Sequence, residues 1–206
     1  MYLLFEGIDG VGKSTQIEKL REKFLNTITT REPAGTKLGV KIRELILNGG
    51  EEISKEAETL LFLADRAEHY NRVIKPNRDR LIVSDRGFIS GVAYSLTNQN
   101  SDLEILKFLN SYALQKSFPD FIFLFCIDKK SLKDRLNRDL DNIEKRGFEY
   151  LLRVQENMRV AVEYFKIPYK IVDATLDIET IHNQITKKIE ELIDFNRNSD
   201  IIIHTK

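Results

Sequence analysis

The sequence has only one cysteine, Cys126, among its 206 residues. A single cysteine cannot form a disulfide within the chain, which is typical of a reducing compartment and excludes a disulfide-stapled scaffold. No apolar run reaches the length that a membrane-spanning helix needs. The opening residues, MYLLFEG, are too few for the apolar core of a signal peptide. We therefore expect a cytoplasmic protein that does not act at a membrane.

An excess of either charge is also missing, because 32 Lys and Arg residues balance 32 Asp and Glu residues. A balanced chain gives no reason to expect nucleic acid as a partner, so any basic site must be local. Repeats, low-complexity tracts and linkers are absent from the sequence, and we expect one domain over residues 1–206. His69, His182 and His204 lack the spacing of a metal site, so we expect no direct chemical role for them.

Short apolar segments alternate with longer segments of helical period along the chain. Five short runs rich in apolar, β-branched or aromatic residues are the expected strands: Tyr2–Glu6, Thr27–Thr30, Leu81–Ser84, Phe121–Ile127 and Tyr169–Val172. Eight segments whose apolar residues recur at helical spacing are the expected helices: Lys13–Leu25, Leu38–Leu47, Lys55–Ile74, Ile89–Leu96, Leu103–Lys116, Ser131–Arg138, Glu144–Phe165 and Glu179–Phe195. This alternation predicts an α/β fold with a parallel sheet and right-handed crossovers. The tail, residues 196–206, stays open, because Ile201–Ile203 suits a late strand, a docking patch or a frayed end.

The segment GIDGVGKS, Gly7–Ser14, matches the phosphate-loop pattern G-x-x-x-x-G-K-[ST] directly after the first expected strand and at the start of the first helix. Its glycines allow successive backbone N–H groups to face one anion at a helix N-terminus. Lys13 is expected to reach the β- and γ-phosphates of a nucleotide, and the Ser14 hydroxyl to bind Mg²⁺. We expect the nucleotide to contact the loop and its flank: Gly7, Gly10, Val11, Gly12, Lys13, Ser14 and Thr15. Asp9 is unexpected, because it puts a carboxylate into a loop that attracts anions.

Two further loops follow expected strands. The segment SDRG places Asp85 and Arg86 beyond the third strand, and ligands bind beyond strand ends in parallel sheets. Asp85 can hold Mg²⁺ or its waters, and Arg86 offers a planar fork for a phosphate. Such a pair can also be a local ion pair. The segment TREPAGT, Thr30–Thr36, follows the second strand and has either a role in the site or ordinary turn chemistry.

The helical segment EAETLLFLADRAEHY carries Phe62 and Arg66 four positions apart, which puts them on one helix face. An aromatic ring beside a guanidinium can stack on a flat base and bond its edge. The same spacing also fits a core aromatic next to a solvated charge, so spacing alone does not decide between the two.

Several motifs together carry a resemblance to a known family. FEGIDGVGKST, TREPAGT, LLFLADRAEHY, SDRGFISGVAYS, LDNIE and VDAT occur in the order and at roughly the spacing found in thymidylate kinases, and the chain resembles them through about Phe195. The resemblance implies a P-loop NTPase-type three-layer fold, a five-stranded parallel sheet flanked by helices, with a mobile lid. It also implies a homodimer that uses Mg²⁺ and transfers the γ-phosphoryl group of ATP to dTMP, giving dTDP for dTTP synthesis.

The resemblance implies roles for the residues of the acceptor side. Phe62 stacks on thymine, Arg66 meets the base edge, and Arg86 binds the dTMP phosphate. Tyr94 crowds the sugar 2′ position and so disfavours ribonucleotides, and Asp9 accepts a hydrogen bond from the 3′-hydroxyl. The other implied contacts line the dTMP cleft or touch the adenine of ATP: Ser90, Arg31 and Glu32 for dTMP, and Asp173, within VDAT, for ATP.

The acceptor of the reaction is a phosphate that is already ionised, so no general base is needed and catalysis rests on positioning and positive charge. Val11 stands where some members of the family carry a basic residue. The charge must then come from the lid, about residues 133–147, unless its arginines belong to an ordinary solvated helix. The cations that we expect to be catalytic are Lys13, Arg86, Arg135 and Arg138.

Some positions depart from the family pattern. Asn142 stands where the lid generally has an arginine, which leaves open which lid arginine is catalytic. Gly91 and Ser95 stand where polar residues often help to read thymine, which predicts looser base selectivity. Gly87 replaces the tyrosine or similar residue that usually follows the Asp-Arg pair.

Other functions share a phosphate loop. A kinase for another nucleoside monophosphate or for a deoxynucleoside would read a different base, and Asp9, Phe62 and Tyr94 together argue against it. A switch GTPase needs an N/T-K-x-D motif after a late strand, and FIFLFCIDKKS does not supply one. For a relative that only binds nucleotides, Asn142 is the one hint in the sequence. The sequence therefore predicts a dTMP kinase.

Overall fold

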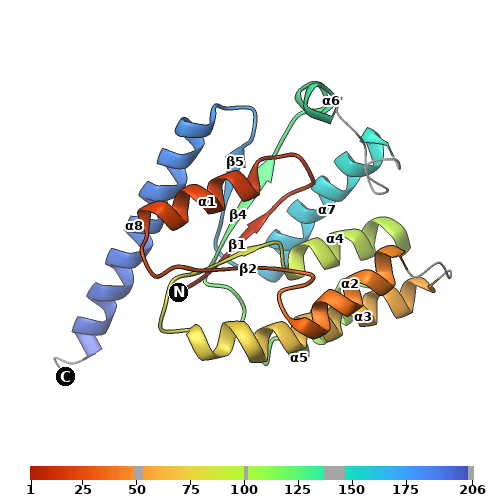
Figure 1. Cartoon of the computed structure of the whole chain (residues 1–206), viewed down its shortest axis with the longest axis horizontal. Coiled ribbons are helices and arrows are strands. Elements are labelled where there is room, and N and C mark those ends of the chain that lie inside the picture. The colour runs from red at the N-terminus through yellow and green to blue at the C-terminus, as the bar shows by residue number, and fades with distance from the viewer. Residues whose placement is uncertain (49–52, 100–101, 137–146, 204–206) are drawn as a thin grey trace.

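A computed structural model of the chain describes residues 1–48, 53–99, 102–136 and 147–203, and its strands form one five-stranded sheet (Figure 1). All neighbouring strands are parallel, and their order is β2-β3-β1-β4-β5. The strands are β1 (Tyr2–Glu6), β2 (Ile28–Arg31), β3 (Ile82–Asp85), β4 (Phe121–Cys126) and β5 (Tyr169–Asp173). The predicted fold class, an α/β fold of the P-loop NTPase type with five parallel strands, is confirmed.

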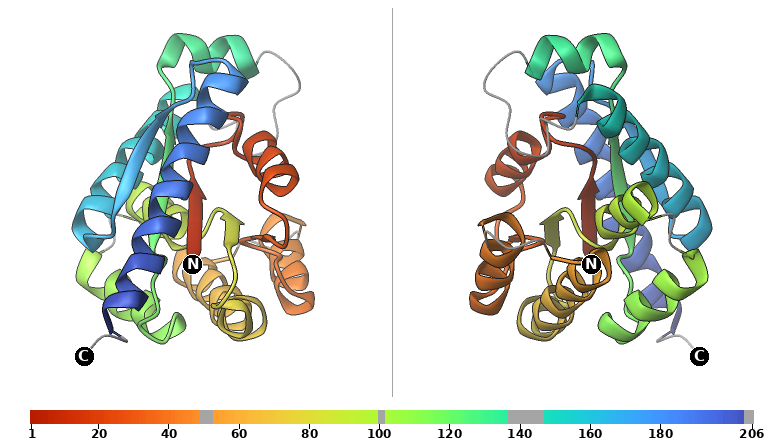
Figure 2. Two further views of the ribbon diagram at one scale, coloured as in Figure 1. Left: turned by 90° about the vertical axis from the view of Figure 1, so that its left-hand side faces the viewer. Right: turned by 90° about the vertical axis from the view of Figure 1, so that its right-hand side faces the viewer.

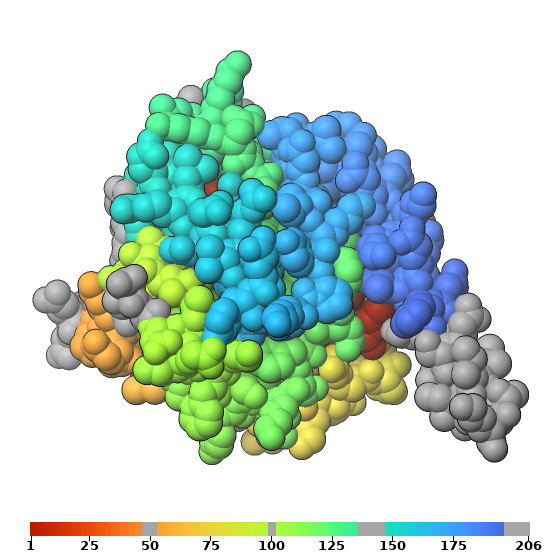
Figure 3. Space-filling model, turned by 180° about the vertical axis from the view of Figure 1, so that it is seen from behind, coloured from red at the N-terminus to blue at the C-terminus, as the bar shows by residue number. Residues whose placement is uncertain are grey.

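Helices cover both faces of this sheet. They are α1 (Lys13–Lys23), α2 (Lys37–Asn48), α3 (Lys55–His69), α4 (Phe88–Gln99), α5 (Leu103–Ala113), α6 (Lys129–Leu136), α7 (Phe148–Phe165) and α8 (Ile178–Ile203). Helices α1 and α8 pack together on one side of the sheet, and α4 and α7 pack together on the other (Figures 1 and 2). Seen from behind, α7 and the segment from β5 into α8 cover the middle of the molecule (Figure 3).

The helix predicted for Lys55–Ile74 changes type along its length. It is α-helical up to His69, continues as a π-helical turn over Tyr70–Ile74, and ends in a 3₁₀ turn over Lys75–Asn77. Pro76 lies in that last turn, and its missing N–H and its ring prevent a regular α-helix from continuing. Apolar periodicity does not distinguish these helix types, so the sequence predicted one uniform helix.

The last helix is longer than predicted. Helix α8 continues to Ile203, so the late strand considered for Ile201–Ile203 is wrong. Its first turn is capped by Asp177, whose side chain accepts a hydrogen bond of 2.9 Å from the N–H of Thr180. No helix formed by the described residues is long and apolar enough to cross a membrane.

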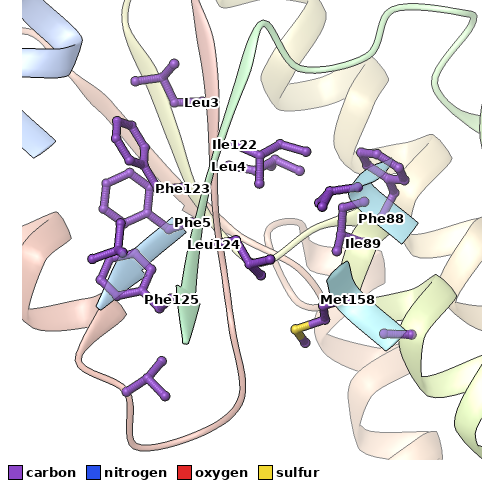
Figure 4. Packing of buried hydrophobic residues seen from close by; sticks show 14 of the residues in the cluster. Leu3, Leu4, Phe5, Phe88, Ile89, Ile122, Phe123, Leu124, Phe125 and Met158 are labelled. Atoms are coloured by element: carbon purple, nitrogen blue, oxygen red, sulfur yellow. The ribbon is translucent and has the colours of Figure 1, made fainter. Parts of the chain in front are cut away.

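The core lies on both faces of the neighbouring strands β1 and β4. Three aromatic rings from β1 and β4 contact one another on the side of α1 and α8: Phe5, Phe123 and Phe125, with ring centroids 5.2 Å and 5.4 Å from Phe5 (Figure 4). The alternate side chains of the same strands point the other way, towards α4 and α7: Leu4, Ile122 and Leu124 face Ile89 and Met158. Because both faces are buried, these strands are apolar throughout rather than alternating.

Four strands have a polar residue at their carboxyl end: Glu6 in β1, Arg31 in β2, Asp85 in β3 and Asp173 in β5. In open parallel sheets, ligands bind beyond the carboxyl ends of the strands. The functional site should therefore lie beyond the carboxyl ends of these strands.

Candidate active site

The phosphate loop joins β1 to α1, as the sequence predicts. Gly12 is the N-cap of α1 and has a left-handed backbone, with φ of 91° and ψ of 14°, which glycine adopts without strain. Because glycine has no capping side chain, the first-turn N–H groups can point at a bound anion, and the helix dipole adds to the attraction. Ser14 and Thr15 are exposed at this end of the helix, whereas the side chain of Val11 is buried. Val11 can thus contact a nucleotide only through its backbone.

Lys13 is held beneath the loop. Its side chain is buried, and Nζ donates hydrogen bonds of 3.0 Å to the Gly7 carbonyl and 2.9 Å to the Ile8 carbonyl. Burial and the neighbouring Arg86 guanidinium lower the pKa of Lys13 to about 8, against the opposing effect of three nearby carboxylates. The predicted phosphate-binding lysine is therefore already placed inside the loop.

Ser14 and Asp85 meet where the sequence predicts the metal. The Ser14 hydroxyl donates a hydrogen bond of 3.0 Å to Oδ2 of Asp85. The other oxygen, Oδ1 of Asp85, is buried and has no hydrogen-bond partner among the described residues. A hydroxyl and a carboxylate oxygen are ligands that Mg²⁺ accepts while keeping several waters and the phosphates of the substrate. The two residues fit a Mg²⁺ ion bound together with ATP.

Arg86 lies between the phosphate loop and α4. Its Nη2 donates a hydrogen bond of 2.6 Å to Oδ1 of Asp9, and its Nη1 donates to the Gly7 carbonyl (2.7 Å) and to Oγ of Ser90 (3.0 Å). Burial raises the pKa of Asp9, but the Arg86 guanidinium and Lys13 outweigh it and hold that pKa below its usual value. In this structure, the unexpected acid of the loop therefore serves as the counter-ion of Arg86.

Glu6 forms a second layer behind this arginine, and the sequence-based interpretation did not include it. It is the last residue of β1, and it is fully buried. One of its oxygens, Oε2, accepts a hydrogen bond of 2.5 Å from the Ser90 hydroxyl, and Oε1 accepts a longer one of 3.4 Å from the Ser90 N–H. The signal in the sequence was an acid at the end of an otherwise apolar strand.

Arg66 belongs to a buried polar cluster and is not part of a solvated helix face. Its side chain donates from Nε to Oε2 of Glu32 (2.9 Å) and from Nη1 to Oδ1 of Asn110 (2.8 Å). The other oxygen of Glu32 is 2.8 Å from Nδ1 of His69, whose Nε2 is 2.7 Å from the Thr30 hydroxyl. Burial raises the pKa of Glu32, but Arg66 and His69 outweigh it and lower the pKa below its usual value. Asn110 and His69 are thus structural partners that the helical pattern did not reveal.

Gly91 accounts for the close approach of Arg66 to α4. A Cβ atom at position 91 would lie 3.2 Å from Nη2 of Arg66, so a larger residue would displace the guanidinium. Phe62, four residues before Arg66, is half-buried. Tyr94 is also half-buried, and its ring centroid is 6.5 Å from that of Tyr150. Phe62 and Arg66 thus lie on α3 and Tyr94 on α4, and these two helices pack together.

The remaining predicted residues are spread around the loop. Arg31 is exposed at the end of β2, where it lines an open pocket of about 400 Å³ together with Ser14 and Asp85. Arg135 of α6 donates hydrogen bonds to the carbonyl of Gly10 (3.3 Å) and to the carbonyl of Ala174. It thereby connects the start of the predicted lid to the phosphate loop.

Asp173 ends β5, and its carboxylate accepts hydrogen bonds from the N–H (2.9 Å) and hydroxyl (2.6 Å) of Thr175. Its side chain shapes the turn that follows β5, so a contact with adenine would come from this turn. Arg138, Asn142 and most of the predicted lid lie outside the described residues.

The fold and these contacts define a P-loop NTPase-type protein, because the loop after β1 holds its lysine and an oxygen pair suited to a metal ion. A family model described as Thymidylate kinase matches residues 5–185, and the chain belongs to the thymidylate kinase family. The family resemblance of the sequence is confirmed.

Curated proteins named Thymidylate kinase are similar to the chain over nearly its full length. One from Sulfurovum sp. (strain NBC37-1) is 53% identical over 186 residues, which cover 90% of this chain and 97% of that protein. One from Campylobacter curvus (strain 525.92) is 50% identical over 198 residues, covering 95% of this chain and all of that protein. One from Nautilia profundicola is 45% identical over the same length and coverage.

Proposed function

We propose that the residues gathered around the phosphate loop transfer the γ-phosphoryl group of ATP to dTMP, giving dTDP, so that the chain is a dTMP kinase. One observation carries this proposal: Lys13 and Arg86 both donate to the carbonyl of Gly7, at 3.0 Å and 2.7 Å. The cation predicted for the donor phosphates and the cation predicted for the acceptor phosphate thus meet at one backbone atom. Transfer between two phosphates needs this convergence of positive charge.

The proposed mechanism uses these side chains for positioning and charge. Lys13 binds the β- and γ-phosphates, and Arg86 holds the acceptor phosphate in line with them. Ser14 and Asp85 would hold Mg²⁺, which would neutralise developing charge on the phosphate oxygens. Arg135, anchored at the Gly10 carbonyl, adds positive charge beside the loop. Deprotonation of the acceptor is not required, because a phosphate oxygen is already a nucleophile at neutral pH.

The acceptor side reads a pyrimidine deoxynucleotide in this proposal. Phe62 supplies the stacking surface, and Arg66, fixed by Glu32 and Asn110, presents its remaining N–H groups to the base edge. Tyr94 limits the space near the sugar. The alternative, a kinase for another nucleoside monophosphate or for a deoxynucleoside, gains no support from the relatives, which are named Thymidylate kinase.

A panel of acceptors tests the proposed function. With ATP and Mg²⁺, phosphorylation of dTMP, dUMP, dCMP, dGMP and UMP is measured in a coupled assay that follows ADP. We expect the highest kcat/KM for dTMP and the lowest values for the purine and the ribonucleotide. A higher kcat/KM for any other acceptor would contradict the proposed function.

We also propose that two copies of the chain form a homodimer in the cytoplasm. Helix α5 supports this proposal, since Ile105, Phe108 and Tyr112 lie three and four residues apart on one face and are 59%, 71% and 81% exposed. The neighbouring α3 adds Leu60, which is 58% exposed. Large apolar side chains exposed on one helix face are typical of a protein interface.

Replacing Phe108 with glutamate is expected to convert the dimer into a monomer, because it puts a charge into the apolar interface. Light scattering after gel filtration measures the mass of each species. The matched control is Lys187→Glu on α8, which introduces the same residue at an exposed position. A wild-type protein that is monomeric at micromolar concentration would contradict the homodimer, and equal masses of the two variants would contradict an interface on α5.

A further inference from the structure

We propose that Glu6 is a positioning residue for the acceptor phosphate, and that it acts through Ser90 by fixing the orientation of Arg86. The inference deepens the proposed function, because it rests on the role of Arg86 as the ligand of the acceptor phosphate. It assigns a task to a buried carboxylate that neither the phosphate-loop pattern nor the mechanism above uses.

The direction of the hydrogen bonds carries the inference. The Ser90 hydroxyl donates its one hydrogen to Oε2 of Glu6 at 2.5 Å, so its oxygen is left to accept. It accepts from Nη1 of Arg86 at 3.0 Å. A residue without an acceptor atom in place of Glu6 would no longer hold the hydroxyl in this orientation. The carboxylate thus turns Ser90 into an acceptor that faces the guanidinium.

We call the hydrogen-bond chain from Glu6 through Ser90 to Arg86 the relay. It determines which N–H groups of the Arg86 guanidinium are available to the substrate phosphate. Nη1 has two hydrogens, and both are used, one by Ser90 and one by the Gly7 carbonyl at 2.7 Å. The fork formed by Nη2 and Nε is therefore the edge that a phosphate can approach, and Asp9 takes one of its N–H groups in this structure. Without the Ser90 contact, the guanidinium could rotate about its last bonds and lose this alignment.

Packing alone does not explain an acid at this position. Glu6 is fully buried at the end of a strand whose other residues are Tyr2, Leu3, Leu4 and Phe5. Burying a carboxylate costs free energy, and burial accordingly raises the pKa of Glu6, although Ser90, Arg86 and Lys13 oppose this effect. An apolar residue would avoid that cost. The carboxyl group instead lies near Arg86 and Lys13, the two cations proposed to bind the phosphates, and both oppose the effect of burial.

The test compares a ligand that has the phosphate with one that lacks it. Glu6→Gln keeps the size of the side chain and removes its charge. Its amide NH₂ group, itself a donor, must then face either the hydroxyl or the N–H of Ser90, which are donors too. We expect dTMP affinity and kcat/KM for dTMP to fall by about tenfold, while thymidine affinity and the KM for ATP stay within about twofold of the wild type. Calorimetry measures the two affinities, and the coupled assay measures the kinetic constants. Equal losses for dTMP and thymidine would mean a general structural role and would overturn the inference.

A double-mutant cycle tests whether the effect passes through Arg86. In an Arg86→Lys background, which has no planar fork, Glu6→Gln should change dTMP affinity by less than about twofold. Independent losses that multiply would show that Glu6 does not act through Arg86, and no loss in the single variant would overturn the relay. Should Glu6→Gln not fold, Ser90→Ala breaks the same relay and must show the same preference for weakening dTMP over thymidine.

The experiment separates this inference from the proposed function. If another monophosphate proved to be the best acceptor, the proposed function would fail, and the comparison would be repeated with that monophosphate and its nucleoside. A loss confined to the phosphorylated ligand would still support the role of Glu6, and equal losses would still contradict it.

Discussion

Arg86→Ala is expected to lower kcat/KM for dTMP by a factor of about 10³ or more, because arginines that stabilise transferring phosphoryl groups contribute about 10³ to 10⁵ in rate. The guanidinium lies between the Gly7 carbonyl and Asp9, next to Lys13, so it is placed to stay bound to the phosphate during the transfer. The KM for ATP should change by less than about threefold, since the lysine and the loop amides remain. Steady-state kinetics with each substrate varied in turn measure both constants.

A matched control separates this effect from a general loss of positive charge. Arg72 pairs with Glu68 on the surface and its side chain is 74% exposed, so Arg72→Ala should leave both constants within about twofold of the wild type. A kcat/KM for dTMP within tenfold of the wild type in Arg86→Ala would contradict the assigned role. If the KM for ATP rose as much as kcat/KM fell, Arg86 would instead be maintaining the shape of the loop.

The largest expected effect on stability comes from Glu32→Ala. Glu32 is paired with Arg66 and His69, and the side chains of all three are at most 4% exposed. Removing one partner of a buried ion pair leaves an uncompensated charge, which costs about 3 to 5 kcal/mol. For a chain of this size, that corresponds to a fall in Tm of about 6 to 20 °C. Thermal unfolding and urea unfolding at neutral pH measure the change.

The pH dependence of this effect has a definite sign. The pKa of Glu32 is lowered in the folded protein, so its charge stabilises the fold above the usual pKa of a glutamate, and this contribution is lost as the pH falls through the lowered value. The difference in unfolding free energy between the wild type and Glu32→Ala should therefore shrink at acid pH. Glu22→Ala, an exposed control on α1, should change stability by less than about 0.5 kcal/mol. A difference below 1 kcal/mol, or one that does not change with pH, would show that the cluster is not held by this charge.

The phosphate loop and the positions of the strands along the chain could be predicted because both depend on local patterns in the sequence. The phosphate-loop pattern from Gly7 to Ser14 could be recognised because its glycines, lysine and serine hydroxyl all lie within eight consecutive residues. Strands β1 and β4 are largely apolar runs covered on both faces, and Tyr2–Glu6 was predicted with its exact bounds. Parallel pairing then places the strand ends, and with them Asp85 and Arg31, at one edge.

The partners of the arginines could not be predicted, since they depend on contacts between distant parts of the chain. Arg66 and Glu32 are 34 positions apart, and Arg66 and Asn110 are 44 apart. Helical spacing left open whether Arg66 was solvated, and only the packing of α3 against α4 and α5 decides that it is buried. Glu6 and Ser90 are 84 positions apart, so the sequence showed an acid at the end of an apolar strand but not its contact with Ser90. The role that the resemblance implies for Asp9 concerns a sugar hydroxyl and stays a prediction.

The ion pair between Asp9 and Arg86, at 2.6 Å, has a consequence for the catalytic cycle. If Arg86 binds the acceptor phosphate, as proposed, that phosphate has to displace the Asp9 carboxylate and does not meet an unpaired guanidinium. When dTDP dissociates, Asp9 can pair with Arg86 again, and the restored ion pair offsets part of the free energy lost when the contact between Arg86 and the phosphate breaks. Competition from Asp9 for Arg86 should therefore raise the dissociation rate of dTDP and lower the affinity for dTMP. Because Asp9 lies in the phosphate loop, that loop would influence product release as well as ATP binding.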